Sequence, residues 1–107
     1  MNVYDIGAEV EVRGIFTTRK LTPTETKKFK DTGELPEGVG VDPDEVTCTV
    51  IAPDDTVTHP EAKGEGGVYG ALVDVTMPGV YQWGITGKGG RKAAKRGAFE
   101  GAEPLPG

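Results

Sequence analysis

The chain has 107 residues, a formal net charge of −5 at neutral pH and a hydrophobic content of 36%. This length fits one domain, because independent domains run from about 50 to 250 residues. The acidic balance argues against charge-driven binding to nucleic acid or to anionic lipid. The 17 glycines and eight prolines favour short strands separated by turns over long helices.

Cys48 is the only cysteine, so the fold cannot depend on an internal disulfide. The first residues lack the basic start and apolar core of a signal peptide. No apolar run approaches the roughly 18 residues that a membrane span needs. We therefore expect the chain to fold in a cytoplasm and to have no membrane partner.

The first predicted strands follow from alternating residues. Residues 8–17 place Val10, Val12 and Phe16 on one side and charged residues on the other, which indicates a half-buried strand. Residues 46–51 alternate in the same way and are rich in valine and threonine, so they predict a second strand.

The second half of the chain continues this pattern. We expect a turn at 53–56, a short return strand over 56–59, a glycine-rich loop at 64–67, and strands at 69–75, 81–85 and around 98–99. Trp83, the only tryptophan, is expected at the centre of the core, because its large ring is costly to leave in water. Short strands at close spacing without intervening helices predict an all-β sandwich or barrel.

Residues 18–40 interrupt the strand pattern. Thr22 and Glu25 have the spacing of a capping box, Pro23 suits a first helical position, and Gly33 suits the end of a helix. These signals predict a helix over residues 23–32. A loop or β-ribbon that extends to Gly40 is the alternative, because so short a helix is marginal on its own.

Two segments are basic although the chain is acidic. Residues 19–30 contain five basic residues and one acidic residue, and residues 88–96 contain five basic residues and no acidic one. Such segments either contact an acidic partner or remain solvated. We expect partner contacts at Lys20, Lys27, Lys28, Phe29, Lys30, Lys88, Arg91, Lys92, Lys95 and Arg96, and at Leu105 in the tail.

Catalytic and ligand sites are not expected. A single histidine in a turn, His59, is more often a surface residue than a base, and Cys48 on a strand is more often a buried, inert thiol. The acidic residues at 42–45 and 54–55 suit turns and lack the spacing of a calcium loop. The segment 87–92 lacks the spacing of a phosphate-binding loop. We expect no catalytic residue, no cofactor and no metal.

Seven segments carry a resemblance to a known family: VYDIG at 3–7, VDPDEVT at 41–47, APDDT at 52–56, GVY at 67–69, PGVYQW at 78–83, TG at 86–87 and GAF at 97–99. In this order they resemble small immunoglobulin-like proteins encoded among tailed-phage structural genes. The resemblance covers most of the chain except residues 18–40 and the final tail. That family joins its first strands by a short turn, so the basic segment is an insertion here.

The resemblance implies an immunoglobulin-like antiparallel β-sandwich over residues 1–101, with an inserted segment at about 18–40 and an extended tail at 102–107. It also implies a non-enzymatic virion protein, expected to be a capsid decoration or accessory protein that binds other virion proteins in many copies. Folding would precede assembly, in the host cytoplasm. The alternatives are a head-to-tail connector or tail accessory protein, and a module that binds carbohydrate or a host surface.

Overall fold

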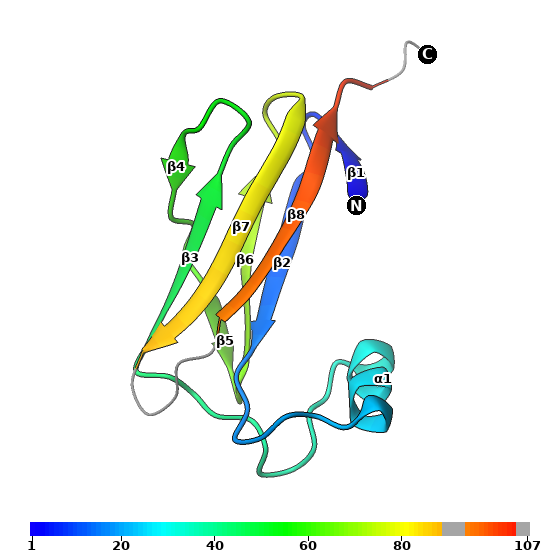
Figure 1. Cartoon of the computed structure of the whole chain (residues 1–107), viewed down its shortest axis with the longest axis vertical. Helices are drawn as coiled ribbons and strands as arrows, with labels where there is room; N and C mark the ends of the chain where they lie inside the picture. Colours follow the sequence, from blue (N-terminus) through cyan, green and yellow to red (C-terminus); the bar gives the residue numbers. More distant parts are fainter. Residues whose placement is uncertain (89–93, 105–107) are drawn as a thin grey trace.

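A computed structural model of the chain describes residues 1–88 and 94–104 as two facing β-sheets with one helix beyond their end (Figure 1). One sheet has five strands in the order β1-β8-β7-β3-β4, and the other has three in the order β2-β6-β5. Neighbouring strands are antiparallel except β1 and β8, which are parallel. The elements are β1 (Asn2–Asp5), β2 (Glu9–Ile15), α1 (Pro23–Thr32), β3 (Glu45–Ile51), β4 (Val57–Thr58), β5 (Lys63–Glu65), β6 (Val68–Asp74), β7 (Gly79–Lys88) and β8 (Ala94–Ala102). The predicted all-β sandwich is confirmed.

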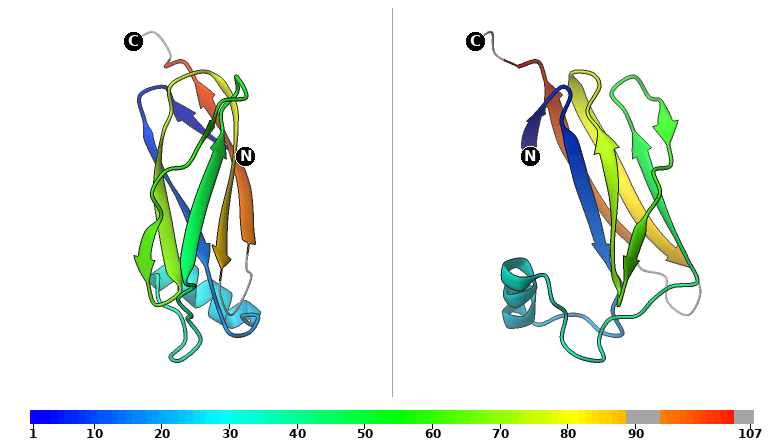
Figure 2. Two further views of the ribbon diagram at one scale, coloured as in Figure 1. Left: turned by 90° about the vertical axis from the view of Figure 1, so that its left-hand side faces the viewer. Right: turned by 180° about the vertical axis from the view of Figure 1, so that it is seen from behind.

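The core lies between the two sheets and consists of the alternate side chains that the sequence pattern selects. Ile85 of β7 is fully enclosed, with 0% of its surface exposed. The left view of Figure 2 shows the two sheets edge-on, one facing the other. The other buried side chains of the core cluster are Val10, Val12, Phe16, Cys48, Val50, Ala71, Val73, Val75, Tyr81 and Phe99.

The prediction that Trp83 occupies the centre of the core is wrong. Its side chain is only partly buried and packs at the margin of the core cluster. Trp83 stands opposite Gly97 in the register of β7 and β8, and its ring lies over that glycine. The large ring therefore occupies space that the adjacent strand β8 leaves free, because Gly97 has no side chain.

Two short strands were not predicted. β1 and β5 are edge strands with mostly exposed residues, so neither shows an alternating pattern. β8 is also longer than expected, because it begins at Ala94 and includes Ala102, the first residue of the predicted tail. Gly97 and Gly101 lower the strand propensity of this segment. A side chain at Gly101 would collide with Val75 and with the carbonyl oxygen of Met77.

The predicted helix is present and has the predicted ends. The Glu25 N–H donates to the Thr22 hydroxyl (3.2 Å), and the Thr22 N–H donates to the Glu25 carboxylate (3.0 Å). Gly33 ends the helix in the left-handed conformation, at φ 74°, and its N–H donates to the Phe29 carbonyl. Local capping thus defines α1, and the alternative of a loop without a helix is wrong.

Among residues 1–88 and 94–104, no helix has the length and apolar character required to cross a membrane.

Candidate partner-binding site

The insertion is attached to the end of the sandwich by backbone hydrogen bonds at its base. The Phe16 N–H donates to the Gly67 carbonyl (2.7 Å), and the Val41 N–H donates to the Phe16 carbonyl (2.9 Å). One step further out, the Thr18 N–H donates to the Val39 carbonyl (2.9 Å). Phe16 itself is buried, with 3% of its surface exposed. Both ends of the insertion are therefore joined to each other and to the sandwich.

Asp42 provides a second attachment at this base. One of its carboxylate oxygens accepts the Gly67 N–H (3.0 Å) and the Tyr69 hydroxyl (3.1 Å). The Tyr69 ring meets Phe16 edge-on, with the ring centroids 5.7 Å apart. Partial burial, together with the hydrogen bond to Asp42 and its charge, raises the pKa of the Tyr69 phenol. Asp42, predicted only as a turn residue, thus connects the insertion to the β5–β6 turn.

A groove of about 350 Å³ lies between the insertion and the sandwich. Its apolar residues are half-buried side chains from β2, from the segment before α1 and from α1 itself. Its basic residues come from the same elements and from β8. The apolar members are Ile15, Leu21 and Phe29, the basic members are Arg13, Lys20, Lys30 and Lys95, and two threonines, Thr17 and Thr26, complete the lining.

The basic residues of this groove differ in their pairing. Arg13 forms an ion pair with Glu11 on the same strand. For Lys20, Lys30 and Lys95, no carboxylate lies within 4.0 Å in the part of the chain that the structure describes. Three lysines without a carboxylate partner among the described residues therefore line the groove beside its apolar residues, on a protein of net charge −5. Such a surface suits a ligand that combines carboxylates with an apolar side chain.

Arg19 holds the segment that carries Lys20 against the helix. Its guanidinium donates to both carboxylate oxygens of Glu25, at 2.7 and 2.8 Å, and to the Lys20 carbonyl at 3.3 Å. The hydrogen bond from Arg19, with that from the Thr22 backbone, lowers the pKa of Glu25 to about 2. Because two parallel N–H···O bonds fix orientation as well as distance, this pair positions one side of the groove.

The structure brings together four of the predicted contact residues: Lys20, Phe29, Lys30 and Lys95 all line the groove. Lys27 lines a neighbouring hollow together with Lys20 and Lys30, whereas Lys28 lies on the same helix outside the groove lining. Lys88 is exposed at the end of β7, beyond the groove. The remaining predicted contacts, Arg91, Lys92 and Leu105, lie outside the described residues.

The strand predicted around residues 98–99 did not include Lys95 and Arg96, but both belong to β8. Because successive residues of a strand point to opposite faces, the two cations separate. Lys95 lines the groove, and Arg96 lines a trough on the outer face of the five-stranded sheet. The sequence analysis missed five lining residues: Arg13, Ile15, Thr17, Leu21 and Thr26. Their only signal in the sequence is that they lie in the insertion or within a few residues of its start.

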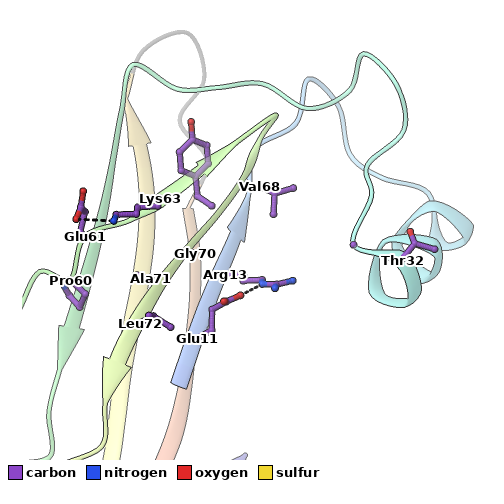
Figure 3. Close-up of a pocket in the computed structure, with 12 residues that line it drawn as sticks. Glu11, Arg13, Thr32, Pro60, Glu61, Lys63, Val68, Gly70, Ala71 and Leu72 are labelled. Atoms are coloured by element: carbon purple, nitrogen blue, oxygen red, sulfur yellow. Dashed lines mark hydrogen bonds and ion pairs between the residues drawn. The ribbon is translucent and has the colours of Figure 1, made fainter. Parts of the chain in front are cut away.

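A larger hollow of about 870 Å³ lies over the outer face of the three-stranded sheet, beside the C-terminal end of α1 (Figure 3). Figure 3 shows Thr32 on α1, across the hollow from this sheet, and two ion pairs on the sheet side. These pairs are Glu11 with Arg13, and Glu61 with Lys63 at 3.7 Å. Because its charges neutralise one another locally, this hollow has less attraction for a charged partner than the groove.

The candidate reactive groups occupy structural positions. The Cys48 thiol is buried at 1% exposure, and burial raises its pKa. His59 is exposed, with Nδ1 at 3.3 Å from the Cys48 carbonyl and from the Thr49 hydroxyl. Asp54 accepts the Thr56 N–H at 3.0 Å, as a turn residue does. Within the described residues, no group of three or more His, Cys, Asp or Glu side chains could hold a metal ion.

The chain matches no protein-family model, no curated protein and no solved structure.

Proposed function

We propose that this chain is an immunoglobulin-like domain that serves as a non-enzymatic structural protein of a tailed-phage particle. In this role it decorates the capsid in many copies, and the groove between the insertion and the sandwich is its contact with a neighbouring virion protein. The observation that carries the proposal of a binding role is the groove, with three lysines beside an apolar patch.

The arrangement of strands supports the immunoglobulin-like assignment. Strands β8, β7 and β3 lie side by side in one sheet, and β2 and β6 pair in the other, as strands G, F, C, B and E do in such domains. The Tyr81 hydroxyl accepts the N–H groups of Thr76 (3.0 Å) and Met77 (3.1 Å), just before the strand that carries Tyr81. This is the geometry of a tyrosine corner. The B–F disulfide of antibody domains has no counterpart, since the chain has one cysteine.

The chemistry of the groove supports an acidic protein partner. Lysine side chains attract carboxylates over several ångströms and guide association, while the apolar patch around Phe29 gives a partner side chain a surface to cover. The ordered base of the insertion supports a preformed contact, because less conformational entropy is lost on binding when a surface is already fixed. Burial of Cys48 and exposure of the isolated His59 fit a role without catalysis.

A particle-incorporation assay tests this proposal. Purified particles should contain the chain by mass spectrometry, and hundreds of copies would indicate capsid decoration. A copy number near six or twelve would instead favour the head-to-tail connector. Absence from intact particles would contradict the virion assignment altogether.

Variants that reverse charges in the groove test whether this surface binds the partner, without altering the fold. We expect the double variant Lys20→Glu, Lys30→Glu to remain folded and to lose incorporation, because it reverses two charges beside the apolar patch. The single variant Lys30→Glu is compared with Lys28→Glu, which reverses one charge on the same helix outside the groove lining. Equal incorporation of the two variants would show that the groove is not the contact.

A further inference from the structure

Strand β8 is paired along nearly its whole length on one side, but only over its last four residues on the other. On one side β7 pairs with β8 from Ala94 to Gly101. On the other side β1 pairs with residues Phe99 to Ala102, and Figure 1 shows β1 beside the upper part of β8 only. Among the described residues, no strand pairs with the lower half of β8 on this side.

The direction of the backbone groups follows from the pairing above. The Ala102 carbonyl accepts the Ile6 N–H at 2.9 Å, so the backbone of Ala102 faces the β1 side. Backbone N–H and C=O groups of successive strand residues point to opposite sides, and alternate residues therefore share a direction. Ala98 and Arg96 lie four and six residues before Ala102 in the same strand. Their N–H and C=O groups thus face the free side, where an incoming strand can pair with them.

A cleft of about 280 Å³ opens beside this free edge, between the two sheets. Buried side chains of β2 and β8 form its apolar wall, and the partly buried Trp83 lies over Gly97 at its side. Arg13 and Lys95 line both this cleft and the groove beside the insertion. The apolar lining comprises Tyr4, Val10, Val12, Trp83 and Phe99.

We propose that the free edge of β8 accepts an extended, acidic segment of a partner protein as an added strand. The backbone of that segment pairs with Arg96 and Ala98, and one of its apolar side chains enters the cleft beside Trp83. Its carboxylates meet Lys95, because Arg13 at this cleft is already paired with Glu11. This mode of recognition combines main-chain hydrogen bonds with pockets for alternate side chains. It is a second binding site and does not require that the partner belong to a virion.

Charge favours a different protein over a second copy of this chain at the edge. If two copies paired through their β8 edges, Lys95 and Arg96 of one copy would lie close to the same two residues of the other. Like charges placed together across a strand pair destabilise it. An acidic segment would instead attract Lys95 and Arg96. It would also pair with the part of β8 that β1 leaves free.

Titration of the full chain with two defined peptides tests the proposal. One is a short synthetic peptide of alternating valine and glutamate, and the other has lysine in place of each glutamate. We expect the glutamate peptide to slow hydrogen exchange at the amides of Arg96 and Ala98, as measured by NMR, and the lysine peptide to leave them unchanged. This measurement uses the unaltered chain and therefore does not depend on the folding of any variant.

Two substitutions at Ala98 then measure the contribution of its backbone N–H to binding. Ala98→Pro removes the N–H that faces the free side, and proline is tolerated on an edge whose N–H points to solvent. Ala98→Val keeps the N–H. We expect Ala98→Pro to bind the glutamate peptide about two- to tenfold more weakly than Ala98→Val, because a strand hydrogen bond is lost.

Three results would overturn the proposal. The first is unchanged exchange at both amides, and the second is equal binding of the two peptides. The third is concentration-dependent self-association that protects the same amides without peptide, which would assign the edge to a second copy. The virion proposal is decided separately by particle composition, so either proposal can fail alone.

Discussion

The indole ring of Trp83 lies over Gly97, its direct neighbour across the β7–β8 pair. A Cβ atom added to Gly97 would lie only 2.5 Å from Cζ2 of this ring. The Trp83 ring can therefore hold this position only if residue 97 has no side chain. Aromatic rings that cover a glycine on the adjacent strand also help to fix the register of the pair. The same contact leaves Trp83 at the margin of the core, beside the free edge of β8.

We expect Gly97→Ala to lower the free energy of unfolding by about 1–3 kcal/mol, because the ring must move from its position. Gly84→Ala is the control: a Cβ there meets only ordinary contacts, at 3.8 Å from the Lys95 carbonyl oxygen. That variant should change stability by no more than about 0.5 kcal/mol. Denaturant unfolding measures both. Equal effects of the two substitutions would mean that the ring does not depend on Gly97.

We expect Tyr81→Phe to destabilise the protein by about 1–3 kcal/mol, because the N–H groups of Thr76 and Met77 lose their common acceptor. Tyr4→Phe removes a hydroxyl that accepts only one exposed bond, from Asn2 at 3.4 Å, and should have little effect. Thermal or denaturant unfolding compares the two. A tolerated Tyr81→Phe would show that the two amides find water instead.

The order of α1 should depend on pH through Glu25. Its pKa falls from the ordinary 4.5 to about 2 in the folded chain, chiefly through the hydrogen bond from Arg19. A carboxyl group with a lowered pKa stabilises the folded state at pH values above its ordinary pKa, and this contribution disappears as the pH falls through the lowered value. The stabilisation is therefore complete above about pH 4.5 and is lost toward pH 2.

NMR titration of the Glu25 carboxyl carbon should give this midpoint directly. In parallel, amide exchange within α1 should accelerate between about pH 5 and pH 2, once corrected for the intrinsic pH dependence of exchange. Glu25→Gln is the control, because it removes the titrating group and should weaken the dependence on pH. A Glu25 midpoint near 4.5 would contradict the role assigned to the pair with Arg19.

The Cys48 thiol should resist modification in the folded protein. Burial shields it and raises its pKa, so little reactive thiolate is present at neutral pH. A colorimetric thiol reagent should react slowly with the native chain and rapidly in denaturant. Fast reaction of the native chain at neutral pH would show that β3 opens locally, since the thiol is otherwise inaccessible.

Local signals in the sequence determined much of the fold. Alternation identified the core faces of β2, β3 and β6, because a strand with one face buried repeats every two residues. Thr22, Glu25 and Gly33 determined both ends of α1, because helix capping uses residues within one turn of each end. The edge strands β1 and β5 gave no such signal, since nearly all of their residues are exposed.

Tertiary structure alone decided where the basic residues act. The sequence indicated two separate basic segments, but the sheet order brings Lys95 of β8 beside Lys20 and Lys30 of the insertion and adds Arg13 from β2. The sandwich also decided the place of Trp83, because the pairing of β7 with β8 puts its ring over Gly97. Strand pairing brings together residues that are far apart in the chain, so the sequence alone does not show which of them become neighbours. The free edge of β8 is likewise a property of the folded sheet, because it exists only where β1 ends.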